Sequence, residues 1–239
     1  MTAKSAAAAA RSTVYGYPRQ GQHRELKKAI EGYWKGRVTA DALRETAAGL
    51  RRTNWRQLAD AGIDEVPTGD FSYYDHMLDT SVMVGAVPAR HRDAVAADAL
   101  DGYFAMARGT QDIAPLEMTK WFDTNYHYLV PELGPATVFT ADPAKQVAEV
   151  GEALALGLTA RPVLVGPLTY LLLAKPAPGV AADFEPLTLL DRLLPVYAEI
   201  IADLRAAGAE WVQLDEPALV QDRTPAELNA AARAYRDLG

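Results

Sequence analysis

Short apolar runs that alternate with helical patterns are the feature of this chain that most limits how it can fold. β-branched and aromatic residues with flanking glycine or proline favour strands over buried helix segments at these runs. Regular alternation of strands and helices predicts βαβ units built around a parallel sheet. The five runs are Thr13–Pro18, Glu65–Phe71, Leu116–Trp121, Arg161–Val165 and Glu210–Leu214.

The segments between these runs have the apolar spacing of amphipathic helices. We expect helices at Arg24–Lys35, Thr39–Ala61, Pro143–Leu156, Leu187–Ala207 and Thr224–Leu238. Glycine, which commonly ends a helix in the left-handed conformation, follows several of them, at Gly36, Gly62, Gly157 and Gly208. The pattern predicts an α/β fold of the (βα)8 TIM-barrel type, here incomplete, with about five parallel βα units in residues 13–239. We expect the Ala-rich residues 1–12 to form a disordered tail.

Composition excludes several classes of function. The chain has no cysteine, so disulfides, thiolate nucleophiles and cysteine-bound zinc are excluded. Its 24 Lys and Arg against 31 Asp and Glu, a net charge of −7, argue against broad nucleic-acid or membrane-surface binding. The longest apolar stretch, around residues 163–174, falls short of the ~20 residues that span a bilayer. We therefore expect a cytoplasmic protein with neither a membrane nor a nucleic acid as its partner.

Polar residues cluster where strands are expected to end, which is the functional face of an α/β barrel. Gly21–Lys28 carries basic side chains at a helix start, so it is either an anion site or a solvated basic turn. Glu117–Tyr128 mixes aromatic and polar side chains, which suits either a small-molecule pocket or core packing. The four histidines, His23, His76, His91 and His127, lack metal-ligand spacing, so we expect no metal site in this chain.

Two pairs of adjacent ionisable residues have roles that the sequence leaves open. Asp75 and His76 could form an acid–base pair, or Asp75 could cap a helix. Asp215 and Glu216 end a strand, where two carboxylates could do acid–base work, hold an ammonium group or make structural hydrogen bonds.

Several longer strings resemble the N-terminal domain of the cobalamin-independent methionine synthase family, from about Val14 to Val220. They are YGYPRQGQHRELKKAIEGYWKG, PTGDFSYYDHMLDTSVMVGAVPAR, LEMTKWFDTNYHYLVPELGP, RPVLVGPLTYLLLAK and AGAEWVQLDEPALV. The resemblance implies a two-barrel 5-methyltetrahydropteroyltriglutamate–homocysteine methyltransferase. In that family zinc, without cobalamin, activates homocysteine toward a folate with a polyglutamate tail, and the amino-terminal barrel helps to hold the folate.

The resemblance also implies site residues. RELK and the lysine of EMTKWF contact the folate triglutamate in the family, and the asparagine of DTNYHY is implicated in some members. These positions are Arg24, Glu25, Leu26, Lys27, Lys120 and Asn125. No catalytic residue is implied here. The zinc ligands and the homocysteine site belong to the family's carboxy-terminal barrel, so we expect this chain alone to be inactive.

Two alternatives stand beside this interpretation. The chain could be a truncated, non-catalytic module that binds folate tails. It could also belong to another family of the same barrel superfamily, such as one similar to uroporphyrinogen decarboxylase, although the RELK and EMTKWFDTNYHY strings count against that.

Overall fold

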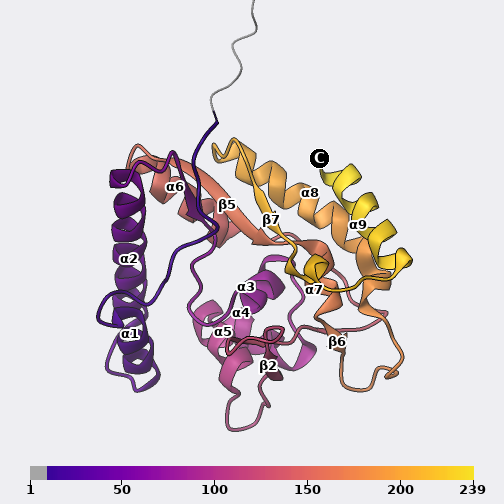
Figure 1. Cartoon of the computed structure of the whole chain (residues 1–239). Helices are drawn as coiled ribbons and strands as arrows, with labels where there is room; N and C mark the ends of the chain where they lie inside the picture. Colours follow the sequence, from indigo (N-terminus) through magenta and orange to yellow (C-terminus); the bar gives the residue numbers. More distant parts are fainter. Residues whose placement is uncertain (1–9) are drawn as a thin grey trace, which may run out of the picture.

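A three-stranded parallel sheet carries the candidate site in a computed structural model that describes residues 10–239 (Figure 1). Its strands are β1 (Glu65–Thr68), β5 (Thr159–Val165) and β7 (Gln213–Asp215), in the order β1-β5-β7. Glu65 pairs with Thr159 and Val163 pairs with Gln213, so the central β5 aligns both neighbours. All three carboxyl ends therefore lie at the same edge.

The first predicted strand, Thr13–Pro18, adds one parallel bridge, between Thr13 and Glu65. Just before it, Ser12 donates its backbone N–H to the Asp64 carboxylate at 2.7 Å, and Arg11 pairs with Glu65 at 3.0 Å. The segment thus lies beside β1 without forming a ladder. Residues 1–9 of the expected tail lie outside the described residues, so the disorder of the tail stays a prediction.

The prediction that Leu116–Trp121 joins the parallel sheet is wrong. β2 (Met118–Lys120) pairs antiparallel with β3 (His127–Leu129), and a turn through residues 121–126 reverses the chain between them. Met118 and Lys120 are exposed, whereas a strand inside a parallel sheet is covered on both faces. A second pair, β4 (Glu132–Leu133) with β6 (Lys175–Pro176), is parallel and was not expected from the sequence.

The five expected helices are confirmed. They are α1 (Glu25–Trp34), α2 (Ala40–Asp60), α6 (Ala144–Ala155), α8 (Leu190–Ala206) and α9 (Pro225–Leu238). The glycines predicted at helix ends all have positive φ, from 65° at Gly36 to 107° at Gly208. An α/β fold is thus confirmed. Residues 10–239 show no closed barrel, so the TIM-barrel type stays a prediction.

Further helices lie in segments for which the sequence analysis gave no helix bounds. They are α3 (His76–Met83), α4 (Arg92–Ala97), α5 (Ala99–Arg108) and α7 (Pro167–Leu172), with short 3-10 turns at Ala89–His91, Pro186–Leu189 and Pro217–Val220. Asp75 and Asp98 accept hydrogen bonds from the first N–H groups of α3 and α5. None of the helices in residues 10–239 is both long and apolar enough to cross a membrane.

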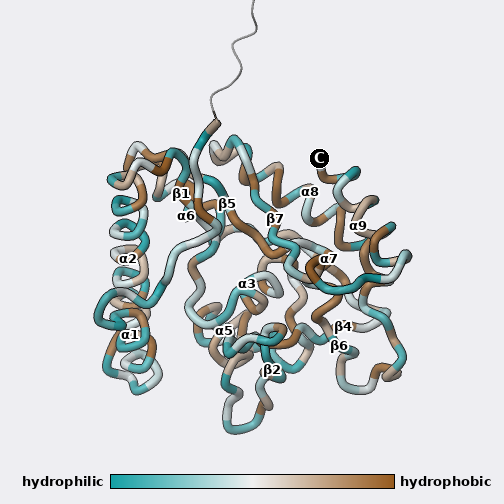
Figure 2. The backbone as a smooth tube through the Cα atoms, in the orientation of Figure 1, coloured by the Kyte–Doolittle hydropathy of each residue, from teal (hydrophilic) through white to brown (hydrophobic). Residues whose placement is uncertain are grey.

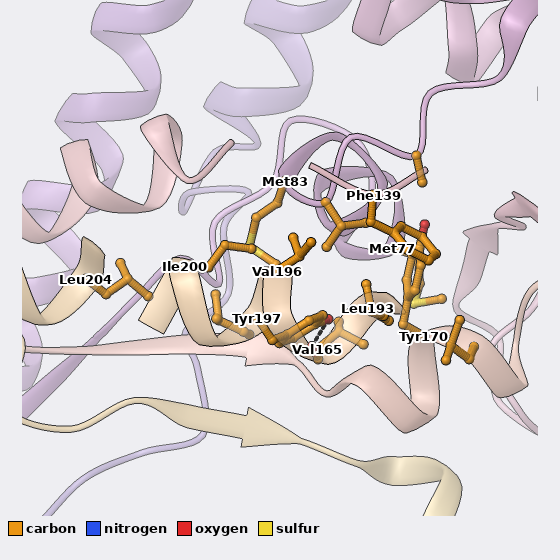
Figure 3. Close-up of a cluster of buried hydrophobic side chains, with 14 of the residues drawn as sticks. Met77, Met83, Phe139, Val165, Tyr170, Leu193, Val196, Tyr197, Ile200 and Leu204 are labelled. Atoms are coloured by element: carbon orange, nitrogen blue, oxygen red, sulfur yellow. Dashed lines mark hydrogen bonds between the residues drawn. The ribbon is translucent and has the colours of Figure 1, made fainter. Parts of the chain in front are cut away.

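Two apolar clusters hold these elements together. Figure 2 colours the apolar residues brown along the backbone, for example in β5 and α7. The larger cluster packs α8 and α7 against β5, and Figure 3 shows Leu193, Tyr197 and Ile200 of α8 within it. The Tyr197 hydroxyl donates to the Val165 carbonyl at 2.8 Å, which ties α8 to the end of β5. The smaller cluster joins α1, α2 and α5.

A buried ionic network links α2, α3 and α6. Arg51 donates to both oxygens of Glu152, at 2.9 and 2.7 Å. Lys145 lies 3.0 Å from Glu149 and 3.4 Å from Asp79. Burial lowers the pKa of Lys145, but the two carboxylates more than offset this and leave it raised, so the ammonium form is favoured.

The larger cluster should supply much of the stability. Leu193 is fully buried on α8, whereas Leu228 on α9 is 52% exposed. Leu193→Ala should lower the free energy of unfolding by ~2–5 kcal/mol because it leaves a cavity. Leu228→Ala, the matched control, should change it by less than ~0.5 kcal/mol. Urea unfolding followed by circular dichroism measures both, and equal losses would contradict the assignment of this core.

The outer edge of β7 should make the isolated chain associate. Within the described residues β7 pairs with β5 alone, which leaves unpaired backbone groups along its other side. Trp211 and Val220 flank this edge and are 64% and 84% exposed. Sedimentation velocity should show concentration-dependent association that Val220→Lys weakens. A monomer at every concentration would contradict this.

Candidate functional site

A cavity of about 560 Å³ lies at the carboxyl ends of β1, β5 and β7. This volume falls in the range of small-molecule pockets. Its wall includes the side chains of Arg19, Asp70, His76, Trp121, Asp215 and Glu216. The expectation that polar residues meet at the strand exits is therefore confirmed for the clusters around Asp70 and Asp215. The polar residues of the third cluster, Lys120 and Asn125, do not line the cavity, and their strand β2 lies outside the parallel sheet.

Asp70 follows β1 and faces the cavity. Its Oδ2 accepts the Tyr17 N–H at 2.8 Å, which joins the N-terminal segment to the exit of β1. Burial raises the pKa of Asp70 to about 6, and this hydrogen bond opposes the rise. Next to it, Gly69 has φ 80°, and a Cβ there would lie 3.1 Å from the Val163 carbonyl oxygen. Glycine thus permits the close approach of β1 to β5 at the cavity.

Asp75 is a buried carboxylate with hydrogen bonds to three separate elements. Its Oδ2 accepts the Leu78 N–H of α3 at 3.0 Å and the Leu129 N–H of β3 at 3.1 Å. Its Oδ1 accepts the Tyr126 hydroxyl at 2.9 Å. Burial raises the pKa of Asp75, while His76 and these hydrogen bonds oppose the rise. The helix-capping alternative for Asp75 is confirmed.

His76 connects Asp75 to the aromatic side of the cavity. Its Nδ1 lies 3.2 Å from the Tyr126 hydroxyl and 3.7 Å from Asp75 Oδ1. Its ring stacks on Tyr126 at 5.5 Å and meets the edge of Trp121 at 4.5 Å. Burial lowers the pKa of His76 although Asp75 and Asp79 oppose this, so the neutral imidazole is favoured.

The two carboxylates after β7 have different surroundings. Glu216 accepts the Leu168 and Thr169 N–H groups at 2.9 and 2.6 Å and so satisfies the start of α7. It also accepts the Tyr235 hydroxyl at 2.9 Å. These bonds favour the structural alternative for Glu216. Asp215 accepts a hydrogen bond from Gln213 at 2.5 Å and lines the cavity.

The turn between β2 and β3, residues 121–126, forms one side of the site. The Trp121 N–H donates to the Tyr126 carbonyl at 2.8 Å, and the Thr124 hydroxyl donates to the Trp121 carbonyl at 2.6 Å. Phe122 has φ 50° within this turn. Lys120 at the end of β2 and Asn125 in the turn are both exposed. The hairpin therefore presents these two side chains to solvent on a turn of defined shape.

The predicted residues at the start of α1 differ in exposure. Arg24 is exposed and has φ 62°, and Lys27 is exposed and lies 3.6 Å from Glu31. A hydrogen bond from its own backbone N–H lowers the pKa of the Glu25 carboxyl, and the His23 N–H, which donates to this carboxyl at 3.0 Å, lowers it further. Leu26 is fully buried in the smaller apolar cluster, so its side chain packs the core.

The predicted residues form two groups that do not touch. Within residues 10–239 no hydrogen bond or ion pair joins the start of α1 to the β2–β3 hairpin, and Figure 1 draws the two apart. Arg19 precedes α1 in the chain and contacts the side of the hairpin. It donates to the Tyr74 carbonyl at 2.8 Å and lines the cavity. Burial raises the pKa of the Tyr126 hydroxyl, and the charge of the nearby Arg19 opposes this rise.

Sequence reasoning noted Arg19 and Tyr126 but gave neither a place in the site. Arg19 follows the first apolar run directly, so its position at a strand exit was the available signal. Tyr126 was treated as one of several aromatic residues that could pack the core. Its contact with Asp75 joins residues 51 positions apart, and no local pattern reveals such a contact.

No metal centre is apparent in the part of the chain that the structure describes. Residues 10–239 contain no group of three or more His, Cys, Asp or Glu side chains placed to hold a metal ion. A catalytic zinc site needs three such protein ligands. The donor set therefore does not fit zinc.

Comparison with known proteins identifies the family of the chain. Residues 11–239 match the family described as cobalamin-independent synthase, N-terminal domain. The 5-methyltetrahydropteroyltriglutamate–homocysteine methyltransferases of Streptomyces avermitilis and Streptomyces griseus are each 88% identical over the whole chain, which covers 31% of each relative. The corresponding methyltransferase of Rhodococcus jostii is 56% identical over 94% of the chain and 29% of its own length.

The chain therefore spans about a third of the length of these relatives. Because the family match extends over nearly all of it, the chain belongs to the cobalamin-independent methionine synthase family, as its N-terminal domain.

Proposed function

We propose that this chain is the folate-tail-binding part of an enzyme that transfers a methyl group from 5-methyltetrahydropteroyltri-L-glutamate to L-homocysteine. The tail would contact Arg24, Glu25, Leu26 and Lys27 at the start of α1, and Lys120 and Asn125 of the hairpin. The names of the relatives, which state both substrates, support the reaction. A cytoplasmic location remains part of this proposal.

The single observation that carries the proposal is that chain neighbours of both segments line one cavity. Tyr15 and Arg19 line it from the segment that leads into Arg24, and Trp121 lines it directly after Lys120. A ligand held in this cavity would meet Arg19 in the wall, and its tail would have to extend beyond the wall to reach the exposed basic side chains of either segment. The protein carries a net charge of −7, so a tail with several carboxylates needs such a local basic surface.

Backbone strain gives further support. Among residues 10–239, Arg24 and Phe122 are the two residues other than glycine with positive φ. Such conformations cost of order 1–3 kcal/mol and cluster at ligand sites. Arg24 lies at the start of α1 and Phe122 lies in the turn of the hairpin, two residues after Lys120. At each position the left-handed backbone sets the direction of the chain next to the basic side chains.

The bonding at the helix start shows how Glu25 and Leu26 would contribute. A carboxylate and an aliphatic side chain cannot pair with an anion, but Glu25 accepts the N–H of His23 and Leu26 anchors the first turn in the core. They would therefore act by fixing Arg24 and Lys27. The basic side chains would supply charge-assisted hydrogen bonds to the tail.

A truncated, non-catalytic module that binds folate tails remains the alternative function. The same two basic segments would serve it, and the short span of this chain relative to the methyltransferases agrees with it equally. The two alternatives differ in whether this domain acts together with a catalytic carboxy-terminal domain.

The tail proposal predicts a selective loss of affinity. In the complete enzyme, Lys27→Ala and Lys120→Ala should each weaken binding of the triglutamyl folate about 10- to 150-fold, because each removes ~1.5–3 kcal/mol of charged hydrogen bonding. Binding of the monoglutamyl folate should change far less. Isothermal titration calorimetry measures both affinities.

Lys35→Ala is the matched control, because Lys35 is an exposed lysine at the opposite end of α1. It should leave both affinities unchanged. If Lys27→Ala and Lys120→Ala weakened the two folates equally, the residues would act on the pterin or on the fold, and the tail proposal would be wrong.

We propose that the zinc and homocysteine sites lie outside this chain, since its donor set does not fit zinc. The 239-residue chain should then bind well below one zinc per molecule by elemental analysis. It should form no methionine from the triglutamyl methyl-folate and homocysteine. Stoichiometric zinc, or methionine made by this chain alone, would contradict the proposed division of roles.

A further inference from the structure

A cluster centred on the buried Asp75 joins α3 to the β2–β3 hairpin. His76 and Tyr126 are partly buried and join it through hydrogen bonds, and the partly buried Trp121 joins it through ring contacts. Asp75 is 1% exposed and reaches both elements through its two oxygens. The hairpin carries Lys120 and Asn125, which themselves make no side-chain hydrogen bond or ion pair within residues 10–239. Something other than their own contacts must fix their position.

We propose that Asp75 is a positioning residue that, through Tyr126, holds the hairpin in the shape that presents Lys120 and Asn125 to the polyglutamate tail. This inference rests on the proposed tail-binding function. Asp75 and Tyr126 need not touch the tail themselves.

The geometry gives the two oxygens of Asp75 different tasks. Oδ2 binds the backbone of α3 and of β3 and so fixes the base of the hairpin against the helix. Oδ1 accepts the Tyr126 hydroxyl and so fixes the far end of the turn, next to Asn125. A carboxylate can accept all three bonds, and charge-assisted bonds are stronger than those between neutral groups.

Aromatic contacts extend the cluster to Lys120. His76 stacks on Tyr126 and meets the edge of Trp121, the neighbour of Lys120 in sequence. Trp121 also packs edge-on against Phe122 at 5.0 Å and Tyr128 at 5.5 Å. The left-handed backbone at Phe122 lies inside this frame. Such a conformation persists only where its surroundings hold it.

Tyr126→Phe tests the inference, because it removes the hydroxyl and keeps the ring that stacks on His76. In the complete enzyme it should weaken triglutamyl folate binding roughly three- to tenfold. Monoglutamyl folate binding and kcat should stay within about twofold, because the methyl-transfer site is untouched. Tyr235→Phe is the matched control, since it breaks another 2.9 Å tyrosine–carboxylate hydrogen bond on α9 and should leave tail selectivity unchanged.

A double-mutant cycle shows whether the cluster acts through Lys120. In a Lys120→Ala background, Tyr126→Phe should have less effect on triglutamyl folate binding than in the wild-type background. Hydrogen exchange should also be faster at residues 121–126 in Tyr126→Phe and unchanged in α8. Asp75→Asn, which can still accept the backbone N–H groups, should fall between wild type and Asp75→Ala in tail selectivity.

Additive effects of Tyr126→Phe and Lys120→Ala, or equal losses for both folates, would overturn the inference. Faster exchange with unchanged tail selectivity would overturn it as well, since the cluster would then be structural only. A Lys120→Ala variant that binds both folates like wild type would instead refute the proposed function. The Lys120→Ala result therefore identifies which of the two has failed.

Discussion

The pairing of β5 with β1 on one side and β7 on the other is the constraint on which the site depends. Parallel pairing sends the carboxyl ends of all three strands to one edge, and the residues that follow them must meet there. Asp70, Gly166 and Asp215 come from positions far apart in sequence, yet the Gly166 N–H donates to the Asp215 carbonyl at 2.7 Å. Helix α8 packs on the sheet and is fixed to the carboxyl end of β5 by the hydrogen bond from the Tyr197 hydroxyl to the Val165 carbonyl.

The polar side chains at that edge divide into those that hold the fold and those left for a ligand. Glu216 is occupied by the start of α7 and by Tyr235, and Asp75 by α3, β3 and Tyr126. Lys27 has a single exposed partner at 3.6 Å, and Lys120 is exposed. An exposed ion pair contributes little free energy, so a carboxylate ligand can replace it at small cost. In the proposed function, Asp75 would hold the hairpin that carries Lys120, and the exposed basic side chains would meet the ligand.

Much of the fold could be predicted from the sequence because the signals were local. Apolar spacing located five helices, and glycine at Gly36, Gly62, Gly157 and Gly208 marked their ends through a backbone conformation that other residues rarely adopt. The direction of β2 could not be predicted, since a short apolar run does not reveal which strand it pairs with. The helices α3 to α5 are short, from six to ten residues, so their apolar spacing gave no bounds, and only the possible cap at Asp75 indicated α3.

For the site, the rule that polar residues gather at strand exits predicted the cavity edge but not the task of each residue. Whether Glu216 is chemical or structural depends on the N–H groups of α7, which lie 48 residues away in sequence. The place of Arg19 in the cavity wall likewise depends on tertiary contacts with Tyr74 and Tyr126. The family resemblance supplied the proposed tail-binding residues, and the geometry adds that Arg19 and Trp121, their neighbours along the chain, line one cavity.

A crystal structure of the complete enzyme with 5-methyltetrahydropteroyltriglutamate bound tests the central claim most directly. The account predicts tail carboxylates within hydrogen-bond distance, ~3 Å, of the side chains of Lys27 or Arg24 on one side and Lys120 on the other. It also predicts that the hairpin of residues 118–129 keeps its contacts with Asp75. Electron density that placed the tail away from both basic segments would contradict the account.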